Sequence, residues 1–564
     1  MGTLFSALDI GRSGLHAAQL QLDTAGHNIA NVNRTGYSRQ RVELAERSPI
    51  FTSEGAIGRG VGIETIARIR DTFLDEAYVR QSPALGFAEV RAQYFTLIED
   101  SYLEPTDNGF GTRLTDFFDA LNDFANNVES ASVREAFLTE ASSVASSLND
   151  LISRFDQLRT NANEEVKNLV PEVNSLATQI AALNVQIRDT EGFGQPANDL
   201  RDERQVLLDE LSRLINITTR EDSSGQINVI IGSQILVDTK GAREVIAFRN
   251  AGLDPERQDL VELRFADDNS LVEVRDGEIY GAITIRDQVL VEQDAQIDEL
   301  AAALIYQINR IHSQGNGIEN LSGTLSSTNL VSAATDPLVS AGLPFTLTPG
   351  TFDVIVYDGA GTPTTTTITI TNASTLNSLA ADLNAIPNFS ASVSGETLSL
   401  GTTSPYTFSF ANDTSGALAA LGVNGLFTGT DARSIAVSQD ILDNPNWLTS
   451  AYSSDVLNTG DNSAALDMAN LRTALVLDSD SSTFDEFYQS IVTGLGVDSR
   501  SNTQQLDVTT QFVNDIDRRR QEVSGVNLDE EVAGLIQYQR AFEAAARVIT
   551  VADRMLETLL NTAA

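Results

Sequence analysis

The strongest constraint on this chain is an apolar repeat of seven residues near each end of its sequence. Near the start, the repeat falls on Leu8, Leu15, Leu22 and Ile29. Near the finish, it falls on Leu528, Leu535, Phe542, Ile549 and Leu556, with Val532 interleaved. A heptad repeat gives a helix one narrow apolar stripe, which coiled-coil packing needs. We therefore predict two terminal helices, over residues 4–32 and 526–561, that meet each other.

Small residues mark the stripe of the first helix. Gly11, Ala18 and Ala25 occupy its second apolar position, and small side chains let another helix approach closely. One interpretation is that both terminal helices belong to the core of a monomeric bundle. The other is that neighbouring subunits complete the packing and the ends fold on assembly. We favour the second, because helices draw most of their stability from tertiary packing and two helices bury little surface.

The charge of the chain limits its partners. It has 564 residues, of which 41% are hydrophobic, enough for about four domains. The net charge of −41 makes nucleic acid and an anionic membrane poor partners. Residues 1–50 carry five Arg against four acidic residues, whereas residues 313–500 carry three Arg against eighteen. We expect the nearly neutral ends to pack against copies of themselves and the acidic middle to face water.

Several classes of protein are excluded by absent residue types and patterns. The sequence has no cysteine, which excludes disulfides, thiolate catalysis and Cys-ligated metals. No apolar run reaches the roughly 18 residues of a membrane span. The first 30 residues contain Asp9, Arg12 and Asp23 but no apolar block, so we expect no secretory signal peptide. Secretion would then need a route without a cleaved leader.

Internal stretches with apolar residues every three or four positions predict further helices. These stretches are residues 72–98, 132–190, 199–214, 282–312 and 464–524. Pro171 should kink or restart the longest one, because its ring clashes with the preceding turn. Residues 38–70 are expected to be extended. Short strands are expected at 227–231, 235–237, 245–248 and 260–265.

Period-two alternation dominates residues 344–411 and predicts a compact, mostly β domain inserted into a helical chain. One short helix, at about 375–385, interrupts the alternation. The run from Thr364 to Thr371 would be an aggregation-prone edge strand if left alone, so we expect it to be paired.

Together, these patterns predict an α+β multidomain fold with terminal coiled-coil helices, a long helical bundle and inserted β-rich outer domains. The expected segments are an N-terminal assembly helix and extended segment (1–70), a first bundle half (71–215), a small β domain (216–281), a returning helix and linker (282–343), a β-rich outer insert (344–435), a second bundle half (436–524) and a C-terminal assembly helix (525–564).

No residue cluster predicts catalysis, a metal site or a cofactor. His16, His27 and His312 lie outside any H-E-x-x-H arrangement and are interpreted as helix-surface or capping residues. The glycine-rich segment 58–62 lacks the strand-to-helix context of a dinucleotide-binding loop, which favours a β-turn.

Two charged runs also favour structural interpretations. Asp478 and Asp480 hint at calcium, but an EF-hand needs Gly at loop position six and Glu at twelve, where this chain has Thr483 and Gln489. Only an irregular surface cation site stays open there. The run 518–520 is three arginines among acidic residues, which indicates a solvated, salt-bridged helix face.

The segment after the first helix carries the most specific signal. Residues 28–40 read N-I-A-N-V-N-R-T-G-Y-S-R-Q, with motif positions Asn28, Asn31, Thr35, Gly36, Tyr37, Ser38, Arg39 and Gln40. This segment resembles the N-terminal signature of the bacterial flagellar axial proteins, and its last five residues are most similar to the hook-associated branch. Residues 525–531 and 537–542 resemble the C-terminal end of that family. Residues 198–204 and 232–237 resemble two of its internal stretches.

The resemblance implies a structural, non-enzymatic subunit without cofactors, located in the extracellular flagellum. It implies a ring of subunits that joins hook and filament, with the terminal helices packed as concentric coiled coils. The implied partners are further copies of the chain, the hook protein and a second hook-associated junction protein. The resemblance also implies export in an unfolded, uncleaved state by the flagellar type III apparatus, after a FlgN-type export chaperone has bound the C-terminal helix.

On this interpretation, the apolar repeat is the assembly interface: Leu8, Leu15, Leu22, Ile29, Leu528, Val532, Leu535, Phe542, Ile549 and Leu556. The candidate chaperone-binding residues are Leu535, Phe542, Ile549 and Leu556. Gln539 and Asp553 interrupt the repeat, and the sequence leaves open whether they face a neighbour's polar groups or water.

Two alternatives stay open. A hook or rod subunit of the same family would share the signature from Asn28 to Tyr37. A secreted adhesin or enzyme on a flagellar scaffold would have to use residues 344–435. That segment has no His, no Lys and no metal-ligand spacing, which leaves glycan or host-surface binding open.

Overall fold

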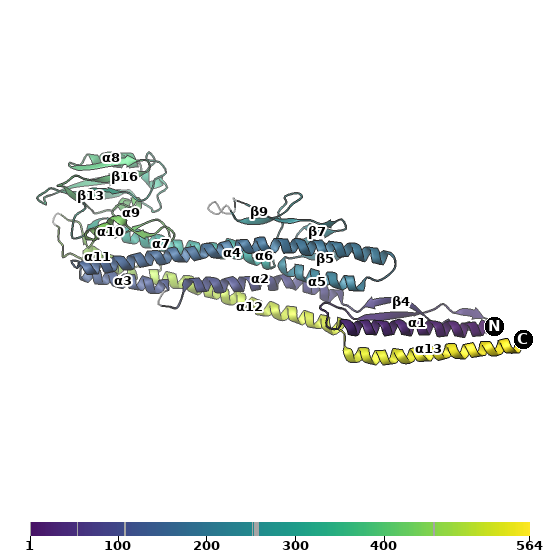
Figure 1. The fold of residues 1–564 in the computed structure, drawn as a ribbon. Coiled ribbons are helices and arrows are strands. Elements are labelled where there is room, and N and C mark those ends of the chain that lie inside the picture. The colour runs from purple at the N-terminus through teal and green to yellow at the C-terminus, as the bar shows by residue number, and fades with distance from the viewer. Residues whose placement is uncertain are drawn as a thin grey trace. The chain divides into compact units, whose positions relative to one another are not determined.

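The computed structural model describes residues 2–52, 55–106, 109–250, 252, 259–454 and 457–563. The chain forms two compact units, each assembled from separated segments. Unit 1 comprises residues 1–93, 161–285 and 501–564, and unit 2 comprises residues 94–160 and 286–500. Helices α2 (Thr72–Tyr102), α4 (Ala131–Gly192) and α12 (Phe484–Ser524) contribute residues to both units (Figure 1).

The two terminal helices lie side by side in unit 1, as their repeats predict. Helix α1 spans Gly2–Asn31 and α13 spans Leu528–Ala563 (Figure 1). Position 11 of α1 lies against position 549 of α13, whereas position 28 contacts position 531, so the helices are antiparallel. Helix α13 begins at a capped end, because the Asn527 side chain accepts a hydrogen bond from the Asp529 amide at 3.0 Å.

A two-stranded ribbon also packs on α1. Strands β1 (Gln40–Glu46) and β4 (Val61–Arg68) pair antiparallel, and the β2–β3 hairpin (Ile50–Thr52, Gly55–Ile57) lies between them in sequence. Gly60 approaches α1 with a φ of +83°, and a Cβ built there would lie 2.2 Å from Ser13 Oγ. Only glycine tolerates both this conformation and this distance, so close contact with α1 explains part of the glycine-rich segment 58–62.

The rest of unit 1 combines helices with small antiparallel sheets. The helices are α5 (Asn198–Leu214) and α6 (Glu278–Thr284). The strands are β5 (Thr218–Glu221), β6 (Ile227–Ile231), β7 (Gln234–Asp238), β8 (Gly241–Ala242), β9 (Val245–Arg249) and β10 (Val261–Phe265). They form a sheet in the order β5-β6-β7-β8 and a separate β9–β10 pair.

Three asparagines of α4 attach these strands to the helix. The Asn184 side chain donates to Ile227 O at 2.8 Å and accepts from Ile227 N at 3.0 Å. Asn174 binds Val245 N and O in the same two-way manner, and Asn163 binds Val261 N and Asp259 O. Each side-chain amide therefore satisfies backbone polar groups of the strand segment that packs on α4.

The helical part of unit 2 has a core of buried aromatic side chains. Besides its parts of α2, α4 and α12, unit 2 contains α3 (Phe110–Asn126), α7 (Leu290–His312), α11 (Ser463–Asn470) and the 3-10 turn η4 (Leu471–Thr473); the π-helical turn η1 (Ile285–Val289) precedes α7. Phe117, Phe118, Phe124 and Phe137 are fully buried, and the rings of Phe124 and Phe137 stack at 5.7 Å.

The remainder of unit 2 is rich in short strands and includes residues 344–435, the segment expected to be β-rich. One sheet has the order β14-β13-β17 and another the order β12-β16-β15. Their strands are β12 (Thr324–Ser326), β13 (Gly350–Tyr357), β14 (Pro363–Ile370), β15 (Phe389–Ser394), β16 (Thr397–Thr402) and β17 (Thr407–Ala411). Short pairs join β11 (Gly315–Asn316) to β20 (Ala451–Tyr452) and β18 (Phe427–Thr428) to β19 (Ala436–Val437). The helical turns are α8 (Leu376–Asn384), α9 (Ala417–Leu421), α10 (Gln439–Asp443), η2 (Leu338–Ser340) and η3 (Pro445–Trp447).

Two expectations about helix boundaries were wrong. Residues 464–524 are not one helix, because Asp478, Ser479 and Asp480 adopt positive φ angles between η4 and α12. Helix α12 restarts with a capping box, in which Thr483 Oγ1 accepts from the Glu486 amide and Glu486 Oε2 accepts from the Thr483 amide. Pro171 does not restart α4, which is continuous through it.

Two side chains expected at the surface are buried. Arg520 is nearly buried, in contact with Asp75 and Asp209, while Arg518 and Arg519 are exposed and pair with Asp515. Consecutive helix positions point about 100° apart, so three adjacent arginines cannot share one face. His312 is fully buried, whereas His16 is exposed and His27 partly exposed, as expected.

Candidate functional site

The contact between the terminal helices depends on small residues of α1. A Cβ built at Gly11 would lie 2.9 Å from Ile549 Cγ1, and one at Gly14 would lie 3.7 Å from Ala545 Cβ. Ala18 and Ala25 are buried as well. Side chains larger than these would push α13 away, so the small positions in the heptad set the short distance between the helices.

The predicted interface residues divide into two groups. Most are only partly buried, namely Leu8, Leu15, Leu22, Ile29, Leu535, Phe542, Ile549 and Leu556. Leu528 and Val532 are exposed, together with Ile536, Val548, Val551 and Met555 of the same helix. The inward position near the start of α13 is taken by Glu531, which is buried, so the stripe that faces α1 there runs through Glu531 and Leu535.

Asn28 is the centre of a polar contact at the base of the helix pair. Its Nδ2 donates to Gln40 O at 3.0 Å and to Glu531 Oε2 at 3.1 Å. Its Oδ1 accepts from the Gln40 amide at 3.0 Å and from Tyr37 Oη at 2.8 Å. The amide of Asn28 therefore uses its full hydrogen-bonding capacity while almost completely buried.

Ser38 links the same segment to α5. Its amide and hydroxyl each donate to one oxygen of Asp202, both at 2.7 Å. Asp202 also accepts from Arg68 at 3.0 Å and lies 3.4 Å from Arg70. Both Ser38 and Asp202 are buried, and a buried carboxylate requires this density of donors and cations.

Arg39 links the segment to the start of α13. Its Nε lies 2.6 Å from Glu531 Oε1 and its Nη1 lies 2.8 Å from Glu530 Oε2. The Arg39 amide donates to Ser524 O at 2.8 Å, at the end of α12. One residue thereby contacts both helices that meet at the turn around Gly525.

A second set of ion pairs continues from this point. Arg70 binds Asp75 through two nitrogens, at 2.6 and 3.0 Å. Arg520 bridges Asp75 at 2.9 Å and Asp209 at 2.8 Å, with its guanidinium 4.6 Å from the ring centre of Tyr78. Burial raises the pKa of the Asp209 carboxyl even though Arg520 opposes the shift.

These contacts form a single cluster, here called the junction network. Its members are Asn28, Tyr37, Ser38, Arg39, Gln40, Arg68, Arg70, Asp75, Asp199, Asp202, Asp209, Arg520, Glu530 and Glu531. It joins α1, β1, β4, α2, α5, α12 and α13 within unit 1. Burial, with Asp199 and Asp202 adding to it, raises the pKa of the Tyr37 phenol, so that side chain stays protonated as a donor.

Of the remaining motif positions, Gly36 and Asn31 have a structural explanation. Gly36 has a φ of +76°, and a Cβ built there would lie 2.2 Å from Val206 Cγ2 of α5. The Asn31 side chain donates to His27 O within α1 at 3.0 Å. Thr35 is exposed, and nothing in the described structure explains its identity.

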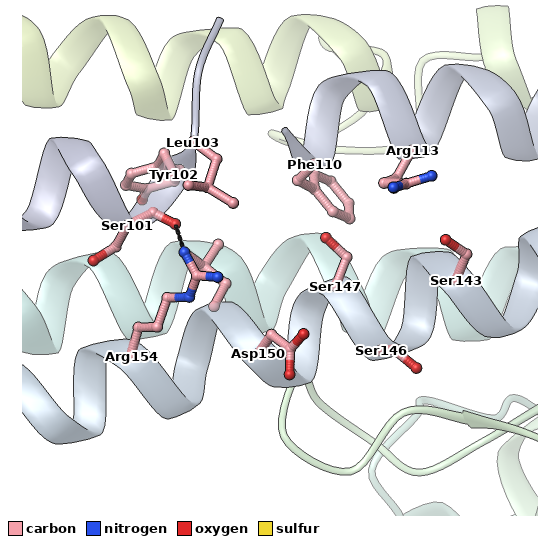
Figure 2. Close-up of a pocket in the computed structure, with 11 residues that line it drawn as sticks. Ser101, Tyr102, Leu103, Phe110, Arg113, Ser143, Ser146, Ser147, Asp150 and Arg154 are labelled. Carbon is pink, nitrogen blue, oxygen red and sulfur yellow. Dashed lines mark hydrogen bonds between the residues drawn. The ribbon is translucent and has the colours of Figure 1, made fainter. Parts of the chain in front are cut away.

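Each unit has a hollow of several hundred Å³. The motif loop, α5 and the α12–α13 turn line a groove of about 950 Å³, with Arg34, Tyr37 and Glu530 among its walls. A cavity of about 440 Å³ in unit 2 lies between the end of α2, the start of α3 and α4 (Figure 2). Ser143, Ser146 and Ser147 line the cavity, but a serine nucleophile needs a base such as histidine, and no histidine lines it.

Models of known protein families match the two ends and the helical part of the chain. A family model described as the flagellar hook-associated protein FlgK helical domain matches residues 95–325. Models described as a flagella basal body rod protein and as the flagellar basal body rod FlgEFG protein C-terminal match residues 8–37 and 519–562. Residues 8–37 cover most of α1 and most of the motif, and residues 519–562 cover α13 except for its last residue.

Full-length relatives decide the assignment. The chain is 27% identical to flagellar hook-associated protein 1 of Bacillus subtilis, over 100% of this chain and 99% of the relative. It is 26% identical to flagellar hook-associated protein 1 of Escherichia coli, over 99% of both. This chain belongs to the flagellar hook-associated proteins. In this family, a solved structure of the flagellar hook junction protein FlgK from Burkholderia pseudomallei shares the fold, with a TM-score of 0.50, 17% identity, and coverage of 80% of this chain and 100% of that one.

Membership in the flagellar hook-associated family confirms the predicted resemblance and the α+β multidomain fold. The structure brings the motif 28–40 together with two of the stretches that carried the resemblance, through Asp199 and Asp202 in one and Glu530 and Glu531 in the other. Sequence patterns indicated no role for Arg68, Arg70 or Asp75, and they placed Arg520 on a solvated helix face, whereas all four residues belong to the junction network. Among the described residues, no helix is long and apolar enough to cross a membrane.

Proposed function

We propose that this chain is a structural subunit of the flagellum at the junction of hook and filament, where copies pack through the outer faces of the α1–α13 pair. The observation that carries the proposal is the set of large apolar side chains that α13 exposes. They are Leu528, Val532, Ile536, Val548, Val551 and Met555. Each contributes about 1.5–3 kcal/mol when fully buried, and exposed apolar patches indicate interaction sites.

The spacing of these side chains supports contacts with more than one neighbour. Leu528, Val532 and Ile536 follow one another at four-residue intervals, and Val548, Val551 and Met555 at intervals of three and four, so each group lies on one helix face. The twelve residues from Ile536 to Val548 rotate the second group by about 120° relative to the first. A single α13 can therefore contact two other helices, as a closed ring of subunits requires.

The junction network has a supporting role in this proposal. It holds the start of α13 and the end of α1 against α5 and α12 through buried hydrogen bonds and partly buried ion pairs. A load applied to the terminal helices in the assembly would thereby be transmitted to the rest of unit 1. Leu8, Leu15, Leu22, Ile29 and the inward residues of α13 support the interface by keeping the two helices paired.

The same geometry bears on export. We propose that the protein leaves the cell uncleaved through the flagellar type III apparatus and that a FlgN-type chaperone binds Leu535, Phe542, Ile549 and Leu556. Because α1 partly covers these side chains in the folded chain, the chaperone would have to bind α13 before α1 does. A peptide of residues 528–563 should then bind the chaperone more tightly than the folded full-length chain, and equal affinities would contradict this order of events.

The comparisons favour the junction role over a hook or rod subunit. Rod-type models match both ends, which these classes share, but the model over residues 95–325 is specific to the hook-associated helical domain. The hook protein and a second hook-associated protein are the partners that this position in the flagellum requires.

A double substitution on the exposed faces tests the function. Val532→Asp with Val551→Asp should leave the chain folded and monomeric, because both side chains are exposed, yet cells carrying it should form hooks without filaments. Electron microscopy of the cells and of the spent medium measures this directly. Val185→Asp, also at an exposed valine but on α4, is the matched control and should assemble normally. Complete filaments from the double variant would refute the proposed interface.

A further inference from the structure

Helix α13 carries its three arginines at a regular spacing of seven residues. They are Arg540, Arg547 and Arg554, and the helix has no lysine. All three side chains are exposed. Seven residues fall about 20° short of two full helical turns, so the three guanidiniums project from one face of α13. Among the described residues, Arg540 pairs with Glu543 at 3.2 Å, whereas Arg547 and Arg554 have no ion pair.

Helix α1 carries its two acidic residues at twice that spacing. Asp9 and Asp23 are fourteen positions apart, with His16 midway between them, and all three side chains are exposed. Neither carboxylate has an ion pair within the described part of the chain. The opposite side of α1 carries Gly11, which packs on Ile549 of the same copy. The acidic line of α1 is therefore turned away from its own α13.

The arginines of α13 border two of the apolar side chains proposed above as contacts between copies. Ile536 lies four residues before Arg540, and Val551 lies four residues after Arg547. Residues four apart are neighbours on a helix surface. Ile536 is 57% exposed and Val551 51% exposed. A helix of another copy that covers these two side chains would therefore also meet the line of arginines.

We propose that the two aspartates of α1 pair with the outer two arginines of α13 in the next copy around the ring: Asp9 with Arg554 and Asp23 with Arg540. This inference rests on the proposed function and adds the partner surface to it. All copies in a ring point the same way, so α1 of one copy runs antiparallel to α13 of its neighbour. In that orientation, a single register places both carboxylates opposite arginines, because the two pairs of residues have the same separation.

The proposed register also accommodates the other charged and titratable side chains on this face of α1. His16 lies opposite Arg547, where a neutral imidazole can accept a hydrogen bond from the guanidinium. Arg12, the one arginine of α1, is three positions from Asp9 and about 60° away around the helix, so it lies off the acidic line. Each copy then uses α1 towards one neighbour and α13 towards the other, which is the heterologous contact that a ring needs.

The pairs would fix the register of neighbouring copies more than they would add to affinity. Exposed ion pairs contribute little individually, and the apolar side chains of α13 supply the larger gain on burial. Like charges placed opposite each other are unfavourable, however, and exclude other registers. The chain has a net charge of −41, so two copies repel each other over most orientations. An arginine line facing an acidic line is one arrangement in which they attract.

Charge reversal tests the pairing in cells. Asp9→Arg with Asp23→Arg should lower several-fold the fraction of hooks that carry filaments, counted by electron microscopy, because arginines then face arginines. Arg540→Asp with Arg554→Asp should do the same. All four substitutions together restore opposite charges and should return the fraction to the wild-type value. Wild-type filamentation in either two-residue variant, or no recovery in the four-residue variant, would overturn the proposal.

The stability of the purified monomers separates pairing between copies from pairing within one copy. All four side chains are exposed, so the urea midpoints of the three variants should equal that of the wild type. Midpoints that fall in the two-residue variants and recover in the four-residue variant would place the pairs within one copy and would refute the proposed contact.

Disulfide cross-linking tests the register, because the sequence has no cysteine of its own. Oxidation of isolated hook–filament structures that contain Asp9→Cys with Arg554→Cys should give a ladder of covalent multimers, since each copy bonds to two neighbours. Dimers alone would indicate a two-fold contact and would refute the pairing. Asp9→Cys with Arg540→Cys is the matched control. It displaces one cysteine by about 21 Å along α13, beyond the roughly 7 Å between Cα atoms that a disulfide spans, and should stay monomeric.

Failure of this inference is distinguishable from failure of the proposed function. Junctions that assemble normally yet give no ladder from Asp9→Cys with Arg554→Cys would overturn the charge pairing and leave the apolar interface of α13 standing. That interface is tested independently by Val532→Asp with Val551→Asp, which changes neither the aspartates of α1 nor the arginines of α13.

Discussion

Asn28 of α1 donates a hydrogen bond of 3.1 Å to Glu531 of α13, joining residues 503 positions apart in the chain. Asn28 is 1% exposed and Glu531 5% exposed. The same amide nitrogen donates to Gln40 O, so three segments meet at one side chain. An unpaired buried amide or carboxylate costs more than an ordinary hydrogen bond contributes. The register of the two terminal helices is therefore specified by a polar contact at their base in addition to their apolar stripes.

Asn28→Ala should lower the free energy of unfolding of unit 1 by about 1–3 kcal/mol, because the Gln40 backbone and the Glu531 carboxylate lose a buried partner. Hydrogen exchange of the α13 amides, measured alongside urea unfolding, should accelerate near residues 531–545. Asn31→Ala is the control, since the hydrogen bond that its side chain donates among the described residues stays within its own helix, to His27 O. Equal effects of the two substitutions would contradict the central position of Asn28.

Asp202→Ala should destabilise the protein more, by roughly 3–5 kcal/mol, because it leaves the largely buried Arg68 and Arg70 without their shared carboxylate. Thermal unfolding with far-ultraviolet circular dichroism measures the loss. Asp189→Ala removes a carboxylate paired with Arg188 at the exposed end of α4 and should change stability by less than about 1 kcal/mol. An unchanged midpoint for Asp202→Ala would show that the ion pairs contribute little.

Gly36→Ala should cost about 1–3 kcal/mol, since alanine would hold a left-handed backbone conformation and meet Val206 Cγ2. Adding Val206→Ala removes the steric contact but not the backbone strain, so the double variant should recover part of the loss. Urea midpoints of the four chains of this double-mutant cycle measure both terms. Full recovery would mean that the positive φ carries no cost.

His312 should make unit 2 less stable as the pH falls from about 6.5 to about 4. Its Nε2 accepts from the Thr449 amide at 3.1 Å, so Nδ1 carries the proton and donates to Asn424 O at 2.8 Å. Burial lowers the pKa of this imidazole to about 4, so between the two values the unfolded chain binds a proton that the folded chain does not. Stability present above about pH 6.5 is thus lost on acidification, by roughly 3 kcal/mol at pH 4.

The fluorescence of Trp447, which is the single tryptophan of the chain and lies two residues from Thr449, reports this unfolding. Burial raises the pKa of Asp294 to about 7, which acts in the opposite direction because its contribution is lost as the pH rises towards 7. The difference between the wild type and His312→Gln isolates the histidine. If the stability difference between the wild type and His312→Gln is the same at pH 6.5 and at pH 4, His312 is not the group responsible.

Local patterns predicted most elements of the fold. The strand expected at 227–231 is β6, and the helix expected at 132–190 is α4 to within two residues at each end. Such elements follow from periodicity and from turn residues close in sequence. The capping box of Thr483 and Glu486 was also readable and would have placed the start of α12. The division of the chain into seven segments stays a prediction.

Positions whose neighbours are far away in sequence were predicted less well. The heptad placed Leu528 and Val532 on the inward stripe, yet Glu531 occupies the inward position because Asn28 and Arg39 bind it there. Arg520 was expected in solvent and instead bridges Asp75 and Asp209. In both cases, partners hundreds of residues away decide the burial of a charged side chain.

The sequence by itself determined that this chain has two long terminal helices with matching apolar stripes, because a repeat of seven residues acts through the geometry of the helix in which it lies. It also determined the family, through a motif whose residues are contiguous. Only the tertiary structure decided what that motif does. Asn28, Ser38 and Arg39 act through buried carboxylates of α5 and α13, and which buried charge meets which partner depends on how distant segments pack.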